Sequence, residues 1–400
     1  RRPATSIRWR VSPPTPAPRR GRSRAEQRST SSSSRLPPPT PRRGPFSQCR
    51  ANRTARFHAE PIRRAATVQP IGEPRDPRLG WTDEAARRLR DLGDVVAGRV
   101  SRLDRGWSTV LTSLDETPLR MRNIGADVAV GDFVVVSDDG ERVDEVLPRR
   151  SAFVRRASFE GRRAEAHTIA ANIDVVMLVH ALTAPPNQRR LERELVLAFD
   201  SGARPVVVLT KTDLVEDAST TVQALSDVAP GVDVRVASGI SGEGVDDLRA
   251  YAADNATIAL LGASGVGKST LVNALVGHER QATNAVRGDE RGRHTTTAAE
   301  LVRMVSGGWL IDTPGVRAVS LWSSGHGIER AFADVFELMD HCRFRNCKHE
   351  LEPGCAVGNA VAAGVLDPRR LESMKRLVSE EAALEEEQRA QEKLLDQIGR

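Results

Sequence analysis

The sequence predicts a multidomain α/β protein with an N-terminal OB-like β-barrel, a central α/β domain with a parallel sheet, and a helical C-terminal domain that holds a metal ion. Three observations support this prediction. Short strand-like segments fill residues 93–148, buried-type strands alternate with helices over residues 149–325, and three cysteines and a histidine cluster within residues 326–400. A chain of 400 residues is long enough for two or three domains.

The first 72 residues have a composition of their own. They hold 17 Arg, no Lys and two acidic residues, a formal charge of +15, which leaves −9 for residues 73–400 because the whole chain carries +6. Such an Arg-, Ser- and Pro-rich tail cannot bury enough apolar surface to fold, so we expect residues 1–72 to be disordered. A transit peptide is one alternative. Another is an artefact of the assigned start, because the first Met is Met121.

Residues 93–148 have the pattern of short strands separated by turns. Five short strands in about fifty residues favour an OB-fold, and an SH3-like barrel is the alternative. The strands are expected at Asp94–Val100, Ser108–Thr112, Leu119–Met121, Asp132–Val136 and Asp144–Leu147.

The barrel region and the linker expected after it, residues 148–163, are rich in arginine and contain Trp107. Arginine binds phosphate and an aromatic ring can stack on bases, so this combination indicates RNA binding on an OB-fold. A solvated arginine surface is the alternative. The candidate arginines are Arg99, Arg102, Arg105, Arg120, Arg122, Arg149, Arg150, Arg155, Arg156, Arg162 and Arg163.

Beyond the linker, apolar strands alternate with helices, which is the pattern of a mostly parallel, doubly wound sheet. The last seventy residues show no strand pattern, and residues 368–399 read as a long, solvated, charged helix. The expected strands are Asp174–Val179, Pro205–Leu209, Val232–Val236, Ile258–Leu261 and Trp309–Ile311, and the expected helices are Leu191–Ser201, Val222–Val228, Gly244–Tyr251 and Lys268–Val276.

A phosphate-binding loop follows the strand at residues 258–261. Its sequence, Gly262-Ala263-Ser264-Gly265-Val266-Gly267-Lys268-Ser269-Thr270, fits the P-loop pattern G-x-x-x-x-G-K-[ST]. The glycines let backbone N–H groups close around phosphates, and the N-terminus of the following helix adds positive potential. We expect Lys268 to contact the β- and γ-phosphates and Ser269 to ligate Mg²⁺.

A guanine-reading segment comes before this loop rather than after it. Thr210-Lys211-Thr212-Asp213 follows the strand at residues 205–209 and matches the element [NT]KxD. The Asp213 carboxylate can accept two hydrogen bonds from the N1–H and N2 amino groups of guanine, a donor pair that adenine lacks. Ala237-Ser238, after the next strand, is expected behind the base. The reversed order predicts a circularly permuted GTPase domain.

The segment Asp312-Thr313-Pro314-Gly315 ends the strand at residues 309–311. Asp312 stands where an acid linked to the metal is expected, and Gly315 where a backbone N–H can sense the γ-phosphate. Many GTPases place Gln after this glycine to orient the attacking water, but this chain has Val316. Hydrolysis must therefore use another group or a partner.

His294, between the P-loop and Asp312, is the candidate for that group, because imidazole can orient or deprotonate water near neutral pH. The alternative is a histidine that packs or contacts RNA. One hydroxyl among Thr295–Thr297 is expected to complete the Mg²⁺ shell, and Thr296 is our choice.

Cys342, Cys347, His349 and Cys355 have the spacing C-x4-C-x-H-x5-C. Three thiolates and an imidazole suit tetrahedral Zn²⁺ and leave no open position, so the expected role is structural. His341 is a competing ligand, and three unlinked buried cysteines are the alternative.

The chain resembles the small-ribosomal-subunit-dependent, circularly permuted GTPases of the RsgA-like family. Four segments carry the resemblance: TKTD, GASGVGKST, Gly292–Thr297 and DTPGV. The resemblance runs from about residue 93 to residue 390 and includes Leu147–Ser151. It implies that His294 takes part in hydrolysis, that the Cys/His spacing holds Zn²⁺, and that the protein acts on the small subunit through its rRNA.

We therefore expect a cytoplasmic, monomeric GTPase that binds the small (30S) ribosomal subunit during late maturation and hydrolyses GTP to GDP and phosphate, faster on the subunit. No apolar run approaches 18 residues, so no membrane span is expected. Two alternatives are an RNA clamp gated by GTP, whose hydrolysis is incidental, and a metabolic P-loop ATPase or kinase. Asp213 argues against the latter.

Overall fold

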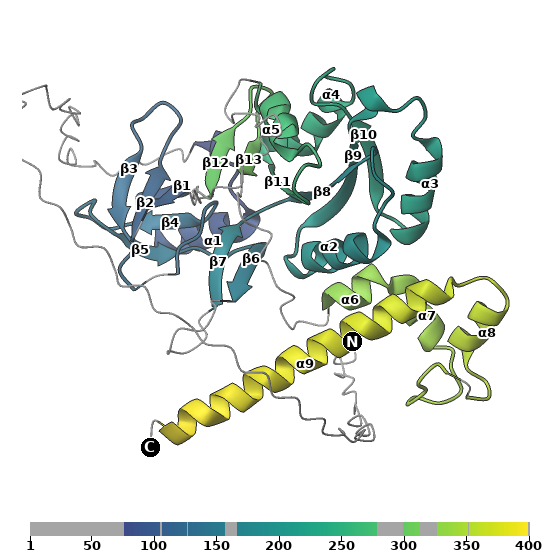
Figure 1. Ribbon diagram of the computed structural model, residues 1–400. Coiled ribbons are helices and arrows are strands. Elements are labelled where there is room, and N and C mark those ends of the chain that lie inside the picture. Colours follow the sequence, from purple (N-terminus) through teal and green to yellow (C-terminus); the bar gives the residue numbers. More distant parts are fainter. Residues whose placement is uncertain are drawn as a thin grey trace, which may run out of the picture. The chain divides into compact units, whose positions relative to one another are not determined.

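The structure is a computed structural model that describes residues 76–104, 106–125, 127–156, 166–277, 299–312, 326–350 and 352–398. The chain divides into two units, Arg1–Pro61 and Ile62–Arg400, and every described residue belongs to the second. This second unit is mixed α/β, with an N-terminal β region, a central α/β domain and C-terminal helices (Figure 1). None of the described helices is long and apolar enough to cross a membrane.

The N-terminal β region contains the five predicted strands and confirms the OB-like barrel. The strands pair antiparallel in the order β3-β2-β1-β4-β5, and a parallel bridge between Arg122 and Arg142 links the two ends of this row. Val100, Val110 and Met121 are fully buried inside it. The strands are β1 (Ala97–Asp104), β2 (Trp107–Leu111), β3 (Leu119–Arg122), β4 (Phe133–Val136) and β5 (Val143–Val146).

A short 3-10 helix, η1 (Pro77–Leu79), and helix α1 (Asp83–Leu92) precede the barrel and were not expected from the sequence. α1 begins where the hydroxyl of Thr82 accepts a hydrogen bond from the N–H of Ala85, at 3.2 Å. Ala85 and Leu89 pack in one apolar cluster with Phe133 of the barrel. Six of its ten residues are charged and two of its four apolar residues are alanines, so the helix was not predicted from the sequence.

The central sheet has the predicted parallel strands in the order β10-β9-β8-β11-β13. Alternate residues of β8 enter different cores: Leu178 packs with α2, and Met177 packs with α4 and α5. Helices thus cover both faces (Figure 1), as a parallel sheet requires. The strands are β8 (Val175–Ala181), β9 (Arg204–Thr210), β10 (Asp233–Ala237), β11 (Thr257–Gly262) and β13 (Trp309–Asp312). The helices are α2 (Gln188–Asp200), η2 (Thr212–Leu214), α3 (Ser219–Val228), α4 (Val245–Arg249), η3 (Ala250–Asn255) and α5 (Lys268–Val276).

A strand that the sequence did not predict, β12 (Glu300–Arg303), continues this sheet. It pairs antiparallel with β13 and, at Arg102↔Glu300, with β1 of the barrel. The barrel and the central domain therefore share one hydrogen-bonded sheet. β12 has four residues and two of them are charged, too short a pattern to identify in advance.

The predicted linker at residues 148–163 is wrong in part. Residues Ala152–Arg156 form β6, which pairs antiparallel with β7 (Ala166–Ala171). Phe153 is buried in the core of the central domain. The many arginines of this segment hid the short apolar stretch that forms the strand.

The C-terminal part is helical, with no strand among the described residues 326–350 and 352–398, as predicted. The predicted solvated terminal helix is wrong for its first turns, because Arg370, Met374 and Leu377 are buried. Here α9 packs against α2 and α6 (Figure 1). The helices are α6 (His326–Ala331), α7 (Ala333–Met339), α8 (Ala356–Ala362) and α9 (Pro368–Ile398).

Arg370 fastens α9 to the rest of the molecule. Its guanidinium donates to both carboxylate oxygens of Asp334, at 2.6 and 2.7 Å, and to the backbone carbonyls of Val228 and Ala331, each at 2.7 Å. The buried carboxylate of Glu192 on α2 lies 3.8 Å away. A single side chain thereby joins α9 to α7, α3 and α2.

Candidate functional site

The segments predicted to bind nucleotide come together at one edge of the central sheet. The strands β9, β10, β11 and β13 are parallel, so their C-terminal ends meet at the same edge. In open α/β sheets ligands bind at this edge. The strand ends carry, in turn, Thr210–Asp213, Ala237-Ser238, the P-loop and Asp312.

The P-loop has the backbone that its glycines predict. β11 ends at Gly262 and α5 begins at Lys268, as a strand–loop–helix motif requires. Gly265 and Gly267 have φ angles of 78° and 94°, which L side chains rarely adopt. A Cβ on Gly262 would lie 2.4 Å from the carbonyl oxygen of Val179, so the loop passes too close to β8 for any side chain.

The guanine-reading segment packs directly on the P-loop. The hydroxyl of Thr210 lies within hydrogen-bond distance of the carbonyl oxygens of Val266 in the loop and His180 on β8, the latter at 3.1 Å. Lys211 then adopts a left-handed conformation, φ 67°, and turns the chain into η2. The two motifs, reversed in sequence, are therefore neighbours in space.

Asp213 is held by the segment after β10. The hydroxyl of Ser238, fully buried, donates to the Asp213 carboxylate at 2.5 Å and accepts the N–H groups of Ile240 and Ser241, each at 3.1 Å. The hydroxyl of Thr212 donates to Glu243 at 2.8 Å. The sequence predicted Asp213 and Ser238 but missed Glu243, which no motif marks.

Asp312 ends β13, the strand beside β11, where Ala259 pairs with Ile311. Ser269 and Thr270 lie in the first turn of α5, directly after the P-loop. The side chain of Lys268 is held against the P-loop backbone, because its Nζ donates a hydrogen bond to the carbonyl of Gly262 at 2.9 Å. The predicted residues His294, Thr296 and Gly315 lie outside the described part of the chain.

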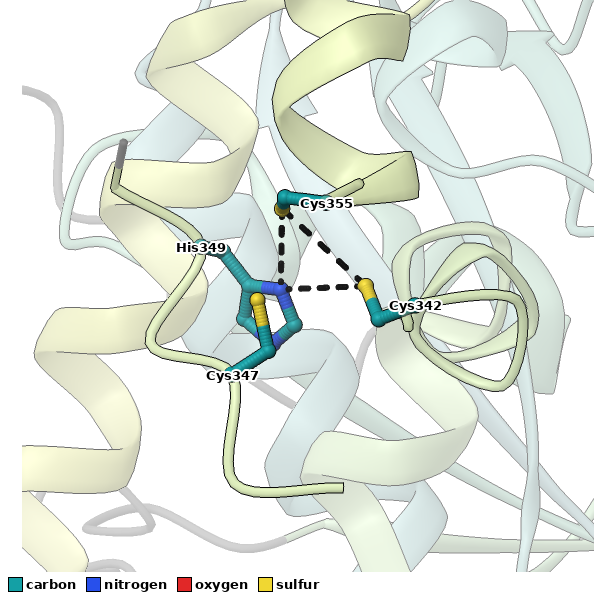
Figure 2. Close-up of side chains that lie close together, drawn as sticks. All are labelled: Cys342, Cys347, His349 and Cys355. Atoms are coloured by element: carbon teal, nitrogen blue, oxygen red, sulfur yellow. Dashed lines mark hydrogen bonds between the residues drawn. The ribbon is translucent and has the colours of Figure 1, made fainter. Parts of the chain in front are cut away.

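A second site, the Cys3His cluster, lies in the C-terminal helical part. The side chains of Cys342, Cys347, His349 and Cys355 converge, and their ligand atoms all lie within 4.8 Å of one another (Figure 2). Nδ1 of His349 is 3.6 Å from Sγ of both Cys342 and Cys355, and those two sulfurs are 4.0 Å apart. Four soft donors at these separations suggest a metal site.

The surroundings hold the cluster in place. The N–H of Gly358, in the first turn of α8, donates to Sγ of Cys355 at 3.1 Å, and Lys375 of α9 donates to the carbonyl of His349 at 3.2 Å. Burial raises the pKa of the Cys347 thiol to about 11 and, with the charge of Lys375, lowers the pKa of His349. His341 is exposed, with Nδ1 2.8 Å from the carbonyl of Glu337, so it is not part of the cluster.

Several arginines predicted to contact RNA have structural partners instead. Arg99 is fully buried, and its guanidinium donates to Leu79 O and Thr257 Oγ1 at 2.8 and 2.7 Å. Arg149 donates to both carboxylate oxygens of buried Asp132 at 2.7 Å, and Arg150 pairs with Asp174. The RNA assignment is wrong for Arg99, because a sequence does not reveal which arginine a fold will bury.

Trp107 and two arginines form a different kind of cluster on the barrel, here called the Trp107 platform. The guanidinium groups of Arg120 and Arg122 on β3 each lie 5.2 Å from the ring centroid of Trp107 on β2. Trp107 and Arg122 are direct cross-strand partners. Both arginines are exposed and the ring is half-buried. An aromatic ring flanked by cations at the surface can receive a base and its phosphates.

Comparisons with known proteins agree with this geometry. A family model described as RsgA GTPase matches residues 146–322. The small ribosomal subunit biogenesis GTPase RsgA of Streptomyces coelicolor is 43% identical over 320 residues, which cover 75% of this chain and 85% of that protein. The protein named RsgA 2 of Vibrio parahaemolyticus is 37% identical over 329 residues, which cover 81% and 91%.

The crystal structure of YloQ, described as a circularly permuted GTPase, aligns with a TM-score of 0.54 and 27% identity, covering 72% of this chain and 96% of that one. Its described permutation matches the order of the TKTD and P-loop segments here. On these similarities, the chain belongs to the RsgA family of circularly permuted GTPases, the small ribosomal subunit biogenesis GTPases.

Proposed function

We propose that this protein binds the small ribosomal subunit through its rRNA, assists late maturation of the subunit, and hydrolyses GTP faster when bound to it, leaving in the GDP form. The observation that carries the nucleotide part is the contact between Thr210 and the P-loop residue Val266, which puts the guanine-reading and phosphate-binding segments side by side. The ribosomal part is supported by the similarity to small ribosomal subunit biogenesis GTPases.

In this proposal the residues at the sheet edge bind different parts of GTP. Asp213, oriented by Ser238, reads the guanine edge. Lys268 and the backbone N–H groups of the P-loop bind the β- and γ-phosphates. Ser269 and Asp312 present oxygens next to the P-loop, which are the donors that Mg²⁺ prefers. Mg²⁺, when bound, neutralises charge that develops on the phosphates.

The attacking water needs a group that Val316 cannot supply. We assign its orientation to His294, and the remaining hydroxyl ligand of Mg²⁺ to Thr296. Because imidazole titrates near neutral pH, it can accept a proton from water without a second base. A partner that holds the His294 imidazole beside the attacking water accelerates the reaction.

The Cys3His cluster is proposed to hold one structural Zn²⁺. In a tetrahedral site with Zn–S of about 2.3 Å and Zn–N of about 2.0 Å, neighbouring donors lie about 3.5 Å (S to N) and about 3.8 Å (S to S) apart. The 3.6 Å and 4.0 Å separations here fit those values. Four protein ligands leave no position for substrate, so the site stabilises the helices around it.

The proposed domains are the barrel at residues 93–148, the GTPase domain at residues 149–325 and the zinc domain at residues 326–400. The barrel presents the Trp107 platform for single-stranded or splayed rRNA bases. A factor that acts on the small subunit works in the cytoplasm, and we propose that it works as a monomer, one copy per subunit.

Binding of the chain to purified small subunits with a non-hydrolysable GTP analogue tests this function. Trp107→Ala should lower the affinity roughly five-fold or more, because stacking one base on an aromatic ring is worth about 1–3 kcal/mol. Tyr251→Ala is the matched control, since its ring also lies between two arginines, Arg204 and Arg235, away from the barrel. Equal affinities for the original chain and Trp107→Ala would contradict the proposed rRNA contact.

A further inference from the structure

An open groove of about 490 Å³ lies between the start of α2 and the first turns of α9, outside both sites described above. Its lining contains two prolines, Pro185 and Pro186, three arginines, one acid and three uncharged polar residues, Asn187, Gln188 and Ser373. The charged residues are Arg189 of α2 and Arg369, Glu372 and Arg376 of α9. The groove is therefore positively charged, although residues 73–400 as a whole carry −9.

Two of these arginines are available to a ligand. Arg189 and Arg369 are exposed, and neither guanidinium makes an ion pair with any residue that the structure describes. Arg376 is half-buried and already engaged, because its guanidinium donates to Ser373 Oγ at 3.2 Å and its Nε lies 3.8 Å from Glu380. The first turn of α2 contains no acidic residue that would offset Arg189 or the positive end of the helix, and Glu372 of α9 is the one acid among the residues that line the groove.

The spacing of the arginines suits a chain of phosphates. Arg369 and Arg376 are seven residues apart, so they project from the same face of α9 about 10 Å apart along its axis. The buried Arg370 and Leu377 fix this part of α9, which makes the groove rigid. Charges about 10 Å apart on one helix are too far apart to bind a single phosphate ion together, but each can contact a different, non-adjacent phosphate of one strand.

We propose that this groove, here called the α2–α9 groove, binds the phosphodiester backbone of an RNA strand and is a second RNA contact besides the Trp107 platform. The prolines provide an apolar wall for ribose or a base, and the arginines hold the phosphates. The identification of that strand as rRNA rests on the proposed function. The contact to phosphates itself rests on the groove alone.

The test is a salt titration of binding to a short single-stranded RNA and, separately, to small subunits. The groove variant carries Arg189→Gln and Arg369→Gln. The matched control carries Arg193→Gln and Arg389→Gln, which remove the same charge from the same two helices, but at arginines paired with Glu380 and Glu385 outside the groove. Thermal unfolding of both variants checks that they fold.

Each phosphate contact to a single strand contributes about 0.7 to the slope of log affinity against log salt. The groove variant should therefore lose about 1.4 from this slope for the RNA, and the control should keep it. An unchanged slope in the groove variant, or an equal loss in the control, would overturn the proposal. The proposal would also be overturned if the original chain bound no RNA and the groove variant lost binding of a nucleoside triphosphate instead, since the groove would then bind small phosphates.

The two RNA probes separate this inference from the proposed function. In one outcome, the groove variant shows a smaller salt slope than the original chain with the short RNA, but the original chain does not bind small subunits. This result would support the proposed RNA contact in the groove and contradict the proposed ribosomal function. If the original chain binds small subunits and the groove variant binds both probes with the original slope, the function stands and the groove fails.

Discussion

At the residue scale, the proposed specificity for guanine depends on the Asp213 carboxylate and on the hydroxyl that donates a hydrogen bond to it, that of Ser238. Ser238 is fully buried, donates to Asp213 at 2.5 Å and is itself held by two backbone N–H groups. This hydrogen bond holds one carboxylate oxygen of Asp213 against Ser238. The sequence contains both residues in recognisable positions, but only the fold shows that one orients the other.

Replacing Ser238 by Ala should raise KM for GTP roughly ten-fold and leave kcat nearly unchanged. The reason is that a hydrogen bond to a charged group is worth about 1.5–3 kcal/mol, and base binding is the same in the ground state and the transition state. Steady-state hydrolysis measures both constants. Ser226→Ala, on α3 away from the nucleotide edge, is the control. A fall in kcat at constant KM would contradict a role of Ser238 in binding the base.

The four residues of the Cys3His cluster were predicted together from their spacing, because metal ligands impose a sequence pattern of their own, and the structure brings them together. Cys347→Ala should abolish the binding of one zinc per chain, measured by elemental analysis, and lower the unfolding temperature. His341→Ala is the matched control, because this histidine lies beside Cys342 and outside the cluster. Loss of zinc in both variants would show that zinc binding depends on residues outside the Cys3His cluster.

At the scale of the elements, the segment around η1 connects the barrel to the central sheet. The Asp76 carboxylate accepts hydrogen bonds from the Arg78 side chain at 2.8 and 2.7 Å and from the N–H of Leu114 at 2.9 Å. The carbonyl of Arg78 in turn accepts from Trp309 Nε1 on β13 at 2.9 Å. No sequence pattern predicted this connection, because it depends on contacts between distant residues.

The Arg78 guanidinium and the backbone N–H groups hold the pKa of Asp76 well below its ordinary value of 3.8. A carboxyl group whose pKa is lower in the folded state stabilises the fold above its unfolded pKa and loses that contribution as the pH falls. The free energy of unfolding should therefore drop below about pH 4. In Asp76→Asn this acid-dependent drop should be smaller, and the stability at neutral pH lower by roughly 1–3 kcal/mol. Parallel urea titrations at pH 7 and below pH 4 measure both, and identical acid profiles would exclude this role.

Helix α9 shows where charge pattern misleads. Its sequence is so rich in charge that it reads as solvated, yet Arg370 is buried with its partners Asp334 and two backbone carbonyls. Removing one partner of a buried ion pair typically costs about 3–5 kcal/mol, because the other charge stays buried. Arg370→Met should lower the free energy of unfolding by that amount, while the exposed Arg369→Met should change it by less than about 0.5 kcal/mol. Equal stabilities of these two variants would show that α9 is not anchored through Arg370.

At the scale of the whole molecule, most of the fold followed from periodicity and motif position. The five barrel strands, the five parallel strands and the nucleotide edge were predicted, since each depends on local alternation or on a strand–loop–helix motif. The elements that were missed, α1, β6 and β12, are short or rich in charge and form through pairing and packing with distant residues.

The missed strand β12 changes how the parts relate to each other. Through it, one sheet runs from the barrel strand β1 to β13, which carries Asp312 at the nucleotide edge. The proposed rRNA platform and the proposed catalytic edge are therefore joined by backbone hydrogen bonds rather than by a flexible linker. This continuity is a physical route by which contact with the subunit can influence hydrolysis.

The most direct test of the central proposal is the rate of GTP hydrolysis by the full chain alone, with purified small subunits, and with large subunits at the same concentration. The proposal predicts slow turnover alone, strong stimulation by small subunits and none by large subunits, with GTP preferred over ATP. Equal rates in all three conditions would contradict a GTPase that the small subunit activates.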